Sequence, residues 1–208
     1  MKILDFGLID YKEAYLKQLE CVQKVIDGAE PMLIFCEHMP VLTLGRLAKR
    51  EYILASDDEL KDKGVSIHNI DRGGEVTLHA PGQLVVYPII DLKKHSKDLH
   101  VYLHNLEEVV IALLTEFDIV SSRVEGNTGA WVKDKKLASI GVGVKKWVTY
   151  HGIGININTD LNLFKLIQPC GLEVIMTSIK NITGKEVDIS KVKSIIFDKL
   201  CNIYSNKE

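Results

Sequence analysis

Lys136 and Cys170 are the two residues of this 208-residue chain whose types most directly suggest covalent chemistry. Cys170 lies in Gln168-Pro169-Cys170-Gly171, where proline and glycine predict a turn. A free cysteine has a pKa of about 8.5, and a nearby ammonium group lowers that pKa because it favours the thiolate. The hypothesis is that Cys170 reacts as a nucleophilic thiolate, which the Lys136 ammonium stabilises. The alternative is an inert turn cysteine and an unrelated surface lysine, because 34 positions separate the two.

Arg72-Gly73-Gly74 opens a second segment with chemical potential, the run from Asp71 to Gln83, which we expect to be a glycine-rich loop between strands. Its backbone N–H groups and the guanidinium could bind an anion. The segment lacks the Gly-Lys-Ser/Thr ending of a P-loop, and no helix follows it. The alternative is a tight hairpin turn with a surface arginine.

His79 and His151 each fall beside glycines on an expected strand. A histidine can orient a substrate or move a proton near neutral pH, and the alternative is that both are structural. No third ligand stands at a recognisable spacing, so we expect no metal site. A local group of lysines either is solvated or steers an acidic partner. These are Lys133, Lys135, Lys136, Lys145 and Lys146.

A pair of apolar, glycine-rich strands occupies residues 136–158. Side chains alternate between the faces of a strand, so Gly141 with Gly143, and Gly152 with Gly154, would each leave one face bare. A long, thin ligand could lie along such a face. The alternative is that the glycines mark bulges or close packing.

The elements that must position these residues follow from hydrophobic periodicity and turn signals. Strands are expected over residues 1–6, 32–36, 41–44, 66–70, 84–90, 119–123, 130–132, 137–144 and 148–157, and helices over 11–27, 56–63, 99–117 and 189–204. The strands come in runs without regular alternation with helices. This order predicts an α+β fold, a mixed, largely antiparallel sheet flanked by helices, in a single domain over residues 1–208.

The composition, 46% hydrophobic and 26% charged, is that of a globular protein. A formal net charge of −2 argues against a nucleic-acid-binding protein. No apolar run reaches the roughly 20 residues that cross a bilayer, and acidic residues stand where a signal peptide has its apolar core. We therefore expect a cytoplasmic protein without membrane attachment. Cys21, Cys36 and Cys201 are expected to be reduced and buried.

Four groups of residues form a pattern from about residue 33 to residue 178. They are Glu37-His38-x-Pro40-Val41-x-Thr43-Leu44-Gly45-Arg46; Arg72-Gly73-Gly74-x-x-Thr77-x-His79-x-Pro81-Gly82-Gln83; Lys136-Leu137-Ala138-Ser139-Ile140-Gly141 with His151-Gly152 and Asn156; and Pro169-Cys170-Gly171 with Thr177-Ser178. In this order they resemble the octanoyltransferase family of lipoate biosynthesis, the LipB proteins.

The resemblance implies the fold of biotin and lipoate protein ligases. It also implies transfer of an octanoyl group from acyl carrier protein to a lysine of lipoyl domains, in 2-oxoacid dehydrogenase E2 subunits and the glycine cleavage H protein. In that family the cysteine matching Cys170 is acylated and the lysine matching Lys136 lowers its pKa. No cofactor, ATP or metal takes part, and we expect a monomer. The implied substrate-binding residues are Arg72, Gly73, Gly74, Glu75, Val76, Thr77, Leu78, His79, Ser139, Ile140, Gly141, Gly152, Ile153 and Gly154.

The chain departs from the family pattern at three places. Leu78 replaces a tyrosine, Ala80 replaces a glycine, and the segment between Cys170 and Thr177 is one residue short. These departures bear on the fit of the acyl chain more than on the chemistry. Two other functions stay open: an ATP-dependent lipoate ligase on the same fold, which would leave Cys170 idle, and a non-catalytic acyl-binding or scaffold protein.

Overall fold

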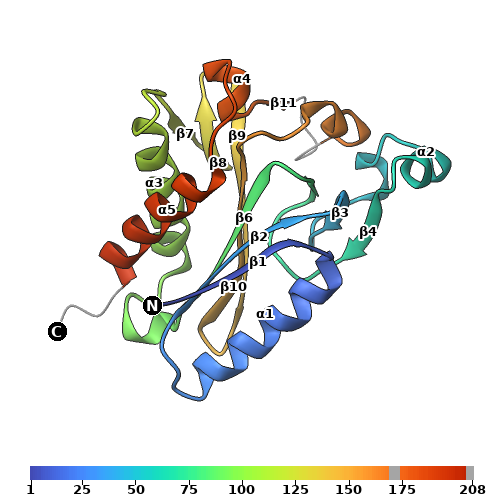
Figure 1. Ribbon diagram of the computed structural model, residues 1–208. Coiled ribbons are helices and arrows are strands. Elements are labelled where there is room, and N and C mark those ends of the chain that lie inside the picture. The colour runs from blue at the N-terminus through green and yellow to red at the C-terminus, as the bar shows by residue number, and fades with distance from the viewer. Residues whose placement is uncertain (169–173, 205–208) are drawn as a thin grey trace.

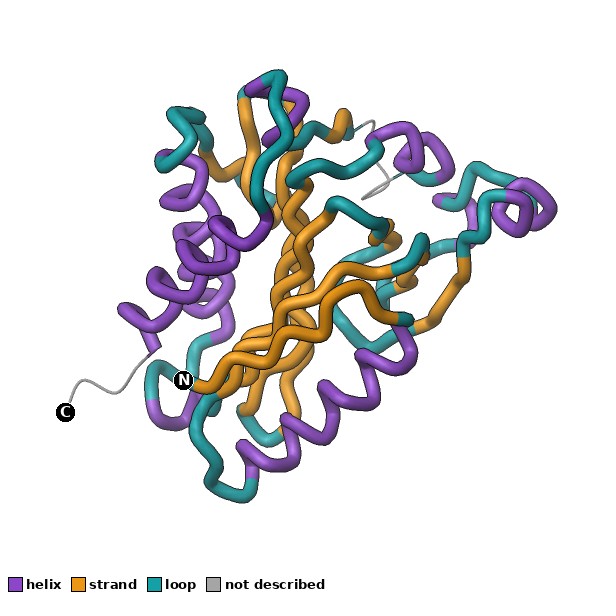
Figure 2. Tube along the Cα trace, in the orientation of Figure 1, coloured by secondary structure: helices purple, strands orange, loops and turns teal. Residues whose placement is uncertain are grey.

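The computed structural model describes residues 1–168 and 174–204, and a mixed sheet forms its centre (Figure 1, Figure 2). The strands lie in the order β1, β2, β6, β10, β9, β8, β7, with β11 against β9. The pairs β1–β2 and β9–β11 are parallel, and the other pairs of this sheet are antiparallel. The bounds are β1 Lys2–Ile9, β2 Met32–His38, β6 Gln83–Ile89, β7 Ser122–Val124, β8 Asn127–Val132, β9 Lys135–Lys145, β10 Val148–Asn156 and β11 Ile175–Met176.

Helices cover both faces of this sheet (Figure 1). Every residue of β6 is buried, and alternate side chains enter different apolar clusters. Leu84 and Val86 pack with α3 (Leu99–Thr115) and α5 (Ile189–Tyr204), whereas Val85 and Tyr87 pack with α1 (Tyr11–Ile26). Because successive side chains of a strand point to opposite faces, this alternation places α1 across the sheet from α3 and α5.

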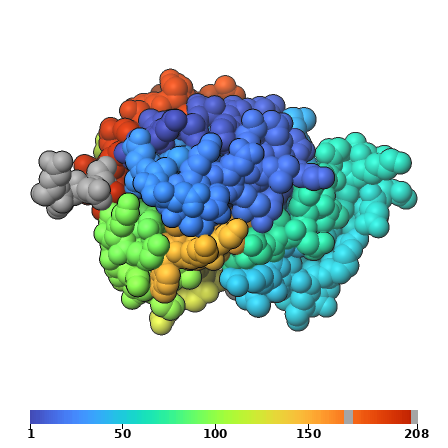
Figure 3. Space-filling model, turned by 90° about the horizontal axis from the view of Figure 1, so that it is seen from below, coloured from blue at the N-terminus to red at the C-terminus, as the bar shows by residue number. Residues whose placement is uncertain are grey.

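A smaller sheet stands beside the first, with the strand order β4, β3, β5. Its strands are β3 Val41–Leu44, β4 Ser66–Asn69 and β5 Val76–His79. Together with α2 (Asp57–Asp62) they enclose a third apolar cluster around Leu42 and Leu78. Figure 3 shows much of this part of the chain, coloured light blue to turquoise, projecting at one side of the molecule. Short 3-10 helices lie at Arg50–Tyr52, Leu92–Lys94 and Leu161–Leu166.

The expected α+β class is confirmed, and all four expected helices match within two residues. The helix α1 begins at Tyr11 because the Asp10 carboxylate accepts a hydrogen bond from the Glu13 N–H. Among the described residues no helix is both long and apolar enough to cross a membrane.

Several segments differ from the prediction. The strand expected over residues 119–123 covers Ser122–Val124, and β11 is not among the expected strands. Val76–His79 is the strand β5 and not part of a loop, because it pairs in register with β3. The residues before the last helix, expected to be an irregular boundary, contain the helix α4, Ile179–Thr183. Ser178 caps α4 at its start, and Gly184, with φ 72°, ends it.

Candidate functional site

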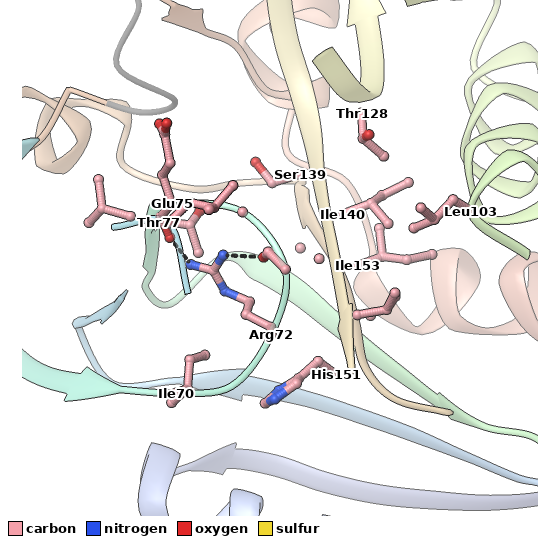
Figure 4. A pocket seen from close by; sticks show the side chains of 18 of the residues that line it. Ile70, Arg72, Glu75, Thr77, Leu103, Thr128, Ser139, Ile140, His151 and Ile153 are labelled. Carbon is pink, nitrogen blue, oxygen red and sulfur yellow. Dashed lines mark hydrogen bonds between the residues drawn. The ribbon is translucent and has the colours of Figure 1, made fainter. Parts of the chain in front are cut away.

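A cavity of about 380 Å³ lies where the two sheets meet, a size typical of small-molecule sites. Lys136 lines it, together with most of the expected substrate-binding residues. Those residues are Arg72, Gly73, Gly74, Glu75, Val76, Thr77, His79, Ser139, Ile140, Gly141, Gly152, Ile153 and Gly154. Figure 4 labels Arg72, Glu75, Thr77, Ser139, Ile140 and Ile153 among them. The structure therefore brings segments distant in sequence to one place.

Leu78 is the described exception. Its side chain is fully buried in the apolar cluster of the smaller sheet and does not line the cavity. It is a β5 residue between Thr77 and His79, which both line the cavity. We therefore leave Leu78 out of the proposed binding residues, and its departure from the family pattern bears on packing of the small sheet.

The cavity extends around an edge of β9. The strand β8 pairs with β9 as far as Ser139, and the Gly73 N–H donates to the Val142 carbonyl farther along, at 3.0 Å. Residues 71–75, called the Arg72 loop, thus occupy part of the β9 edge that β8 leaves unpaired. Figure 4 shows Arg72 to one side of this strand and Leu103 and Ile140 to the other. The wall has a polar side and an apolar side.

The Arg72 guanidinium is buried and holds this loop together. Its Nη2 donates to the Thr43 carbonyl and to the Glu75 carbonyl, each at 2.7 Å, and its Nη1 donates to the Gly73 carbonyl at 2.9 Å. The Thr43 hydroxyl accepts two further bonds, from Nε and Nη2. These bonds fix the guanidinium against Thr43 and the loop backbone, so Arg72 shapes the cavity wall. Its role toward an anion stays a prediction.

His79 lies at the wall as a neutral ring. Its Nδ1 and the Gln83 Oε1 are 2.6 Å apart, and burial lowers the pKa of His79 to about 3. The His38 ring contacts it edge-on, with the two ring centres 5.7 Å apart. Burial also lowers the pKa of His38 to about 4. At neutral pH both rings therefore act as hydrogen-bonding groups without charge.

His151 has a different setting. Its Nε2 lies 3.1 Å from the Asp71 carboxylate, its ring stacks on Tyr15, and its backbone has φ 55°. Burial lowers the pKa of His151 to about 4. Burial alone would raise the pKa of Asp71, but hydrogen bonds from Tyr150 and His151 outweigh it and hold that pKa below its usual value. The left-handed backbone of a buried histidine is a strained conformation that surrounding contacts must maintain.

Lys136 is buried, with 4% of its surface exposed. A β-bulge sits beside it, because Ala130 faces Ala138 while Trp131 faces Lys136, which leaves Leu137 as the extra residue. The Lys136 Nζ lies 5.3 Å from the centre of the Trp131 ring, a cation–π distance. A side chain on Gly129 would come within 2.7 Å of the Lys136 Cε. The bulge and this glycine therefore give the lysine its path to the cavity.

Close packing, one of the two alternatives for the glycines of β9 and β10, accounts for much of their occurrence. A Cβ on Gly143 would meet the Tyr150 ring at 2.6 Å, and one on Gly152 would meet the Val86 carbonyl at 2.3 Å. A Cβ on Gly154 would lie 3.0 Å from the Gln83 Oε1. At Gly141 it would lie 3.0 Å from the Gly73 carbonyl. The bare faces are thus partly filled by neighbouring groups, although Gly141, Gly152 and Gly154 still line the cavity.

The expected basic cluster is not one surface patch. Lys133 and Lys135 lie at the β8–β9 turn, whereas Lys145 and Lys146 lie at the β9–β10 turn. An eleven-residue strand separates the two turns, roughly 35 Å at about 3.3 Å per residue. Lys136 faces the cavity and not solvent.

Cys170, the expected nucleophile, lies outside the described residues, so its relation to Lys136 remains a prediction. Cys21 and Cys36 are buried as expected, and burial raises the pKa of both thiols. Cys201, expected to be buried, is half-buried on α5. In the part of the chain that the structure describes, no group of three His, Cys, Asp or Glu side chains could hold a metal ion.

Sequence reasoning missed the supporting residues of the site. Thr43 holds Arg72, Glu37 accepts a hydrogen bond from the Gly82 N–H at 2.7 Å, and Asp71 binds His151. The first two stand in the motif around His38, so the pattern marked them without assigning a role. Asp71 directly precedes Arg72, but only the fold brings it to β10.

Comparisons with known proteins agree with this geometry. The family model for the lipoyl protein ligase A/B catalytic domain matches residues 10–201. An octanoyltransferase of Caldanaerobacter subterraneus is 43% identical, over 99% of this chain and 91% of that protein. One of Maridesulfovibrio salexigens is 39% identical, over 99% of this chain and 97% of its own. The chain belongs to the octanoyltransferase family. It is therefore an acyltransferase.

Solved structures show that this octanoyltransferase has the fold of lipoate and biotin protein ligases. A putative lipoate protein ligase from Thermoplasma acidophilum has a TM-score of 0.78 at 16% identity, covering 97% of this chain and 84% of its own. The biotin protein ligase from Aquifex aeolicus, in complex with biotin and ATP, has a TM-score of 0.61 at 17% identity. The match covers 97% of this chain and 69% of the ligase. The expected fold is thus confirmed.

Proposed function

We propose that the chain transfers an octanoyl group from octanoyl-acyl carrier protein to a lysine of lipoyl domains, those of 2-oxoacid dehydrogenase E2 subunits and of the glycine cleavage H protein. The observation that carries this proposal is a buried lysine, Lys136, at the wall of a cavity that the family's binding segments also line. A buried cation needs compensation, and a thiolate is a suitable partner. The identity of the transferred group, octanoyl, is inferred from membership of the octanoyltransferase family.

The proposed reaction has two steps, each an exchange at the octanoyl carbonyl carbon. In the first, the Cys170 thiolate forms a bond to that carbon, the bond to the carrier sulfur breaks, and the carrier thiolate leaves and takes up a proton. In the second, the neutral lysine amine of the lipoyl domain attacks, loses a proton, and the Cys170 thiolate departs. The Lys136 ammonium stabilises the Cys170 thiolate before the first step and gives its proton to the leaving carrier thiolate. The neutral Lys136 then accepts the proton of the attacking amine, which restores the ammonium beside the departing Cys170 thiolate.

The cavity would hold the acyl chain during both steps. The backbone of Gly141 and Gly154 and the side chains of Ile140 and Ile153 line the cavity. The two isoleucines offer apolar contact to an acyl chain. Arg72 fixes the polar wall through its bonds to Thr43, and its loop packs against Gly141. The acyl chain would lie along the apolar side of the cavity, beside Ile140 and Ile153, with its thioester end toward Lys136. Backbone N–H groups of the same segments are candidates for binding the tetrahedral oxyanion.

A comparison of acyl donors tests this function against the ligase alternative. An apo lipoyl domain is incubated with the enzyme and either octanoyl-acyl carrier protein or octanoate with ATP, and its intact mass is measured. We expect octanoylation with the carrier donor and none with octanoate and ATP. Modification only with octanoate and ATP would contradict the proposal, and binding of the carrier without modification would favour a scaffold.

A further inference from the structure

A buried chain of hydrogen bonds runs from the cavity wall to the strand β11. It consists of the side chains of His79, Gln83 and Asn156 and the backbone carbonyl of Thr177, called the relay below. The His79 Nδ1 lies 2.6 Å from the Gln83 Oε1, the Gln83 Nε2 donates to the Asn156 Oδ1 at 2.9 Å, and the Asn156 Nδ2 donates to the Thr177 carbonyl at 3.0 Å. All four residues are at most 8% exposed.

The far end of the relay fixes the direction of every bond in it. A backbone carbonyl only accepts, so Asn156 must turn its amide nitrogen to Thr177 and its oxygen to Gln83. Gln83 must then donate from Nε2, which also donates to the Leu78 carbonyl at 3.2 Å. Its Oε1 is left to face His79, whose Nδ1 must therefore carry a proton. The Nε2 of the neutral ring is left with a lone pair.

The relay also reaches the catalytic lysine through the backbone. Thr177 follows β11, which pairs with β9 at Met176 opposite Lys136. The Thr177 N–H donates to the Lys136 carbonyl at 2.9 Å. The same residue thus accepts from the relay and donates to the main chain of Lys136. Gly154 makes room for Gln83 of the relay, since a Cβ there would lie 3.0 Å from the Gln83 Oε1.

We propose that Gln83 and Asn156 are positioning residues, which fix the His79 tautomer so that its Nε2 accepts an N–H of the substrate in the cavity, and which hold Thr177 against Lys136. The proposal rests on the proposed octanoyl transfer. Both substrates carry such a donor: the amide groups of the carrier's pantetheine arm and the lysine amine of the lipoyl domain. Separate rates of acylation and of transfer distinguish these two sources.

The first test needs no variant. Long-range proton–nitrogen correlation spectra of the full chain, labelled with nitrogen-15 histidine, report which ring nitrogen of His79 carries the proton. The titratable or charged groups facing this ring are His38, Tyr11, Arg72 and His151. We expect a proton on Nδ1 and none on Nε2 from pH 8 to about pH 5, because burial holds the ring neutral. A proton on Nε2, or a charged ring, would overturn the proposal.

The second test uses Asn156→Asp, with Asn158→Asp as the matched control. A carboxylate at 156 can accept from Gln83 but cannot donate to Thr177, whereas its protonated form can. Asn158 makes an equivalent pair with Val187, donating to its carbonyl at 2.8 Å and accepting from its N–H at 3.0 Å, outside the relay. Rates are compared with wild type at each pH, after circular dichroism shows that the variants are folded.

We expect N156D to lose about tenfold in acylation or in transfer at pH 8 and to recover relative to wild type as the pH falls, because protonation restores the donor. N158D should show no such pH-dependent recovery. Equal deficits in the two variants at every pH, or full activity of N156D, would overturn the proposal. If wild type transfers no octanoyl group, the proposed function fails, while the His79 spectrum still tests the relay.

Discussion

Lys136 is buried, a setting in which lysines are rarely found. Fully buried lysines are uncommon because desolvation penalises the ammonium group, so surrounding groups must compensate the charge. The Trp131 ring is one such group. The sequence placed Lys136 beside glycine-rich strands, but the bulge that turns it toward the cavity depends on the register of β8 against β9, which no local pattern encodes.

Replacing Lys136 by methionine should raise the pKa of the Cys170 thiol, because the side chain keeps its approximate size but loses the charge. We expect the pH midpoint of Cys170 alkylation by iodoacetamide, followed by peptide mass mapping, to rise by about one unit or more. The matched control is Lys135→Met, since Lys135 is an exposed neighbour on the same strand. An unchanged midpoint in K136M would show that Lys136 does not act on the thiol.

The helices and most strands could be predicted from the sequence because their signals are local. Asp10 and Gly28 mark the ends of α1, and the buried face of α5 follows the helical period. The strand β5 could not be predicted in this way, since Val76–His79 lies in a glycine-rich run and is a strand only through pairing with β3. The close packing at the β9 and β10 glycines could not be predicted either, because the groups that face them come from distant segments.

The Arg72 loop and β9 fit together closely, and two glycines at their contact should respond differently to alanine. A Cβ on Gly141 would come within 3.1 Å of the Gly73 carbonyl and the Arg72 Cδ, whereas one on Gly73 would have its nearest contact at 3.8 Å. We expect Gly141→Ala to push the loop outward and to weaken octanoyl transfer by several-fold, about 1 kcal/mol. Gly73→Ala should stay close to wild type in kcat/KM. Equal effects of the two substitutions would mean that this contact does not shape the cavity.

Three buried neutral histidines link the stability of the whole molecule to pH. Burial lowers the pKa of His38 to about 4, of His79 to about 3 and of His151 to about 4, whereas an unfolded chain has values near 6.5. Between pH 6.5 and about 4 the unfolded state binds more protons, so the free energy of unfolding decreases as the pH falls. The contribution is complete above pH 6.5. Each histidine adds a slope of up to about 1.4 kcal/mol per pH unit.

Urea unfolding at several pH values between 8 and 4.5 measures this slope. His38→Gln should flatten it, because one of the three titrating rings is lost, and His100→Gln is the control, since His100 is exposed on α3. A free energy of unfolding that stays constant from pH 7 to pH 5 would contradict the account. The same curves test the proposed single domain over residues 1–208, which predicts one cooperative transition.

The cavity joins both sheets, so the site is a property of the whole fold. Its walls come from β5, β9, β10 and the Arg72 loop, and the family pattern identified nearly all of these segments from the sequence. The pattern could not predict which of these residues support the structure and which line the cavity. Arg72 fixes its loop through hydrogen bonds to backbone carbonyls, and Leu78 is a core residue; both depend on partners that only the fold assembles.

Intact-mass measurement can show whether the octanoyl group passes through Cys170. The enzyme is incubated with octanoyl-acyl carrier protein, its mass is measured and the adduct is mapped, and an apo lipoyl domain is then added. We predict one octanoyl adduct at Cys170 that moves to the lipoyl domain, lost in Cys170→Ser and retained in the control Cys201→Ser. Undiminished transfer by Cys170→Ser would contradict the account.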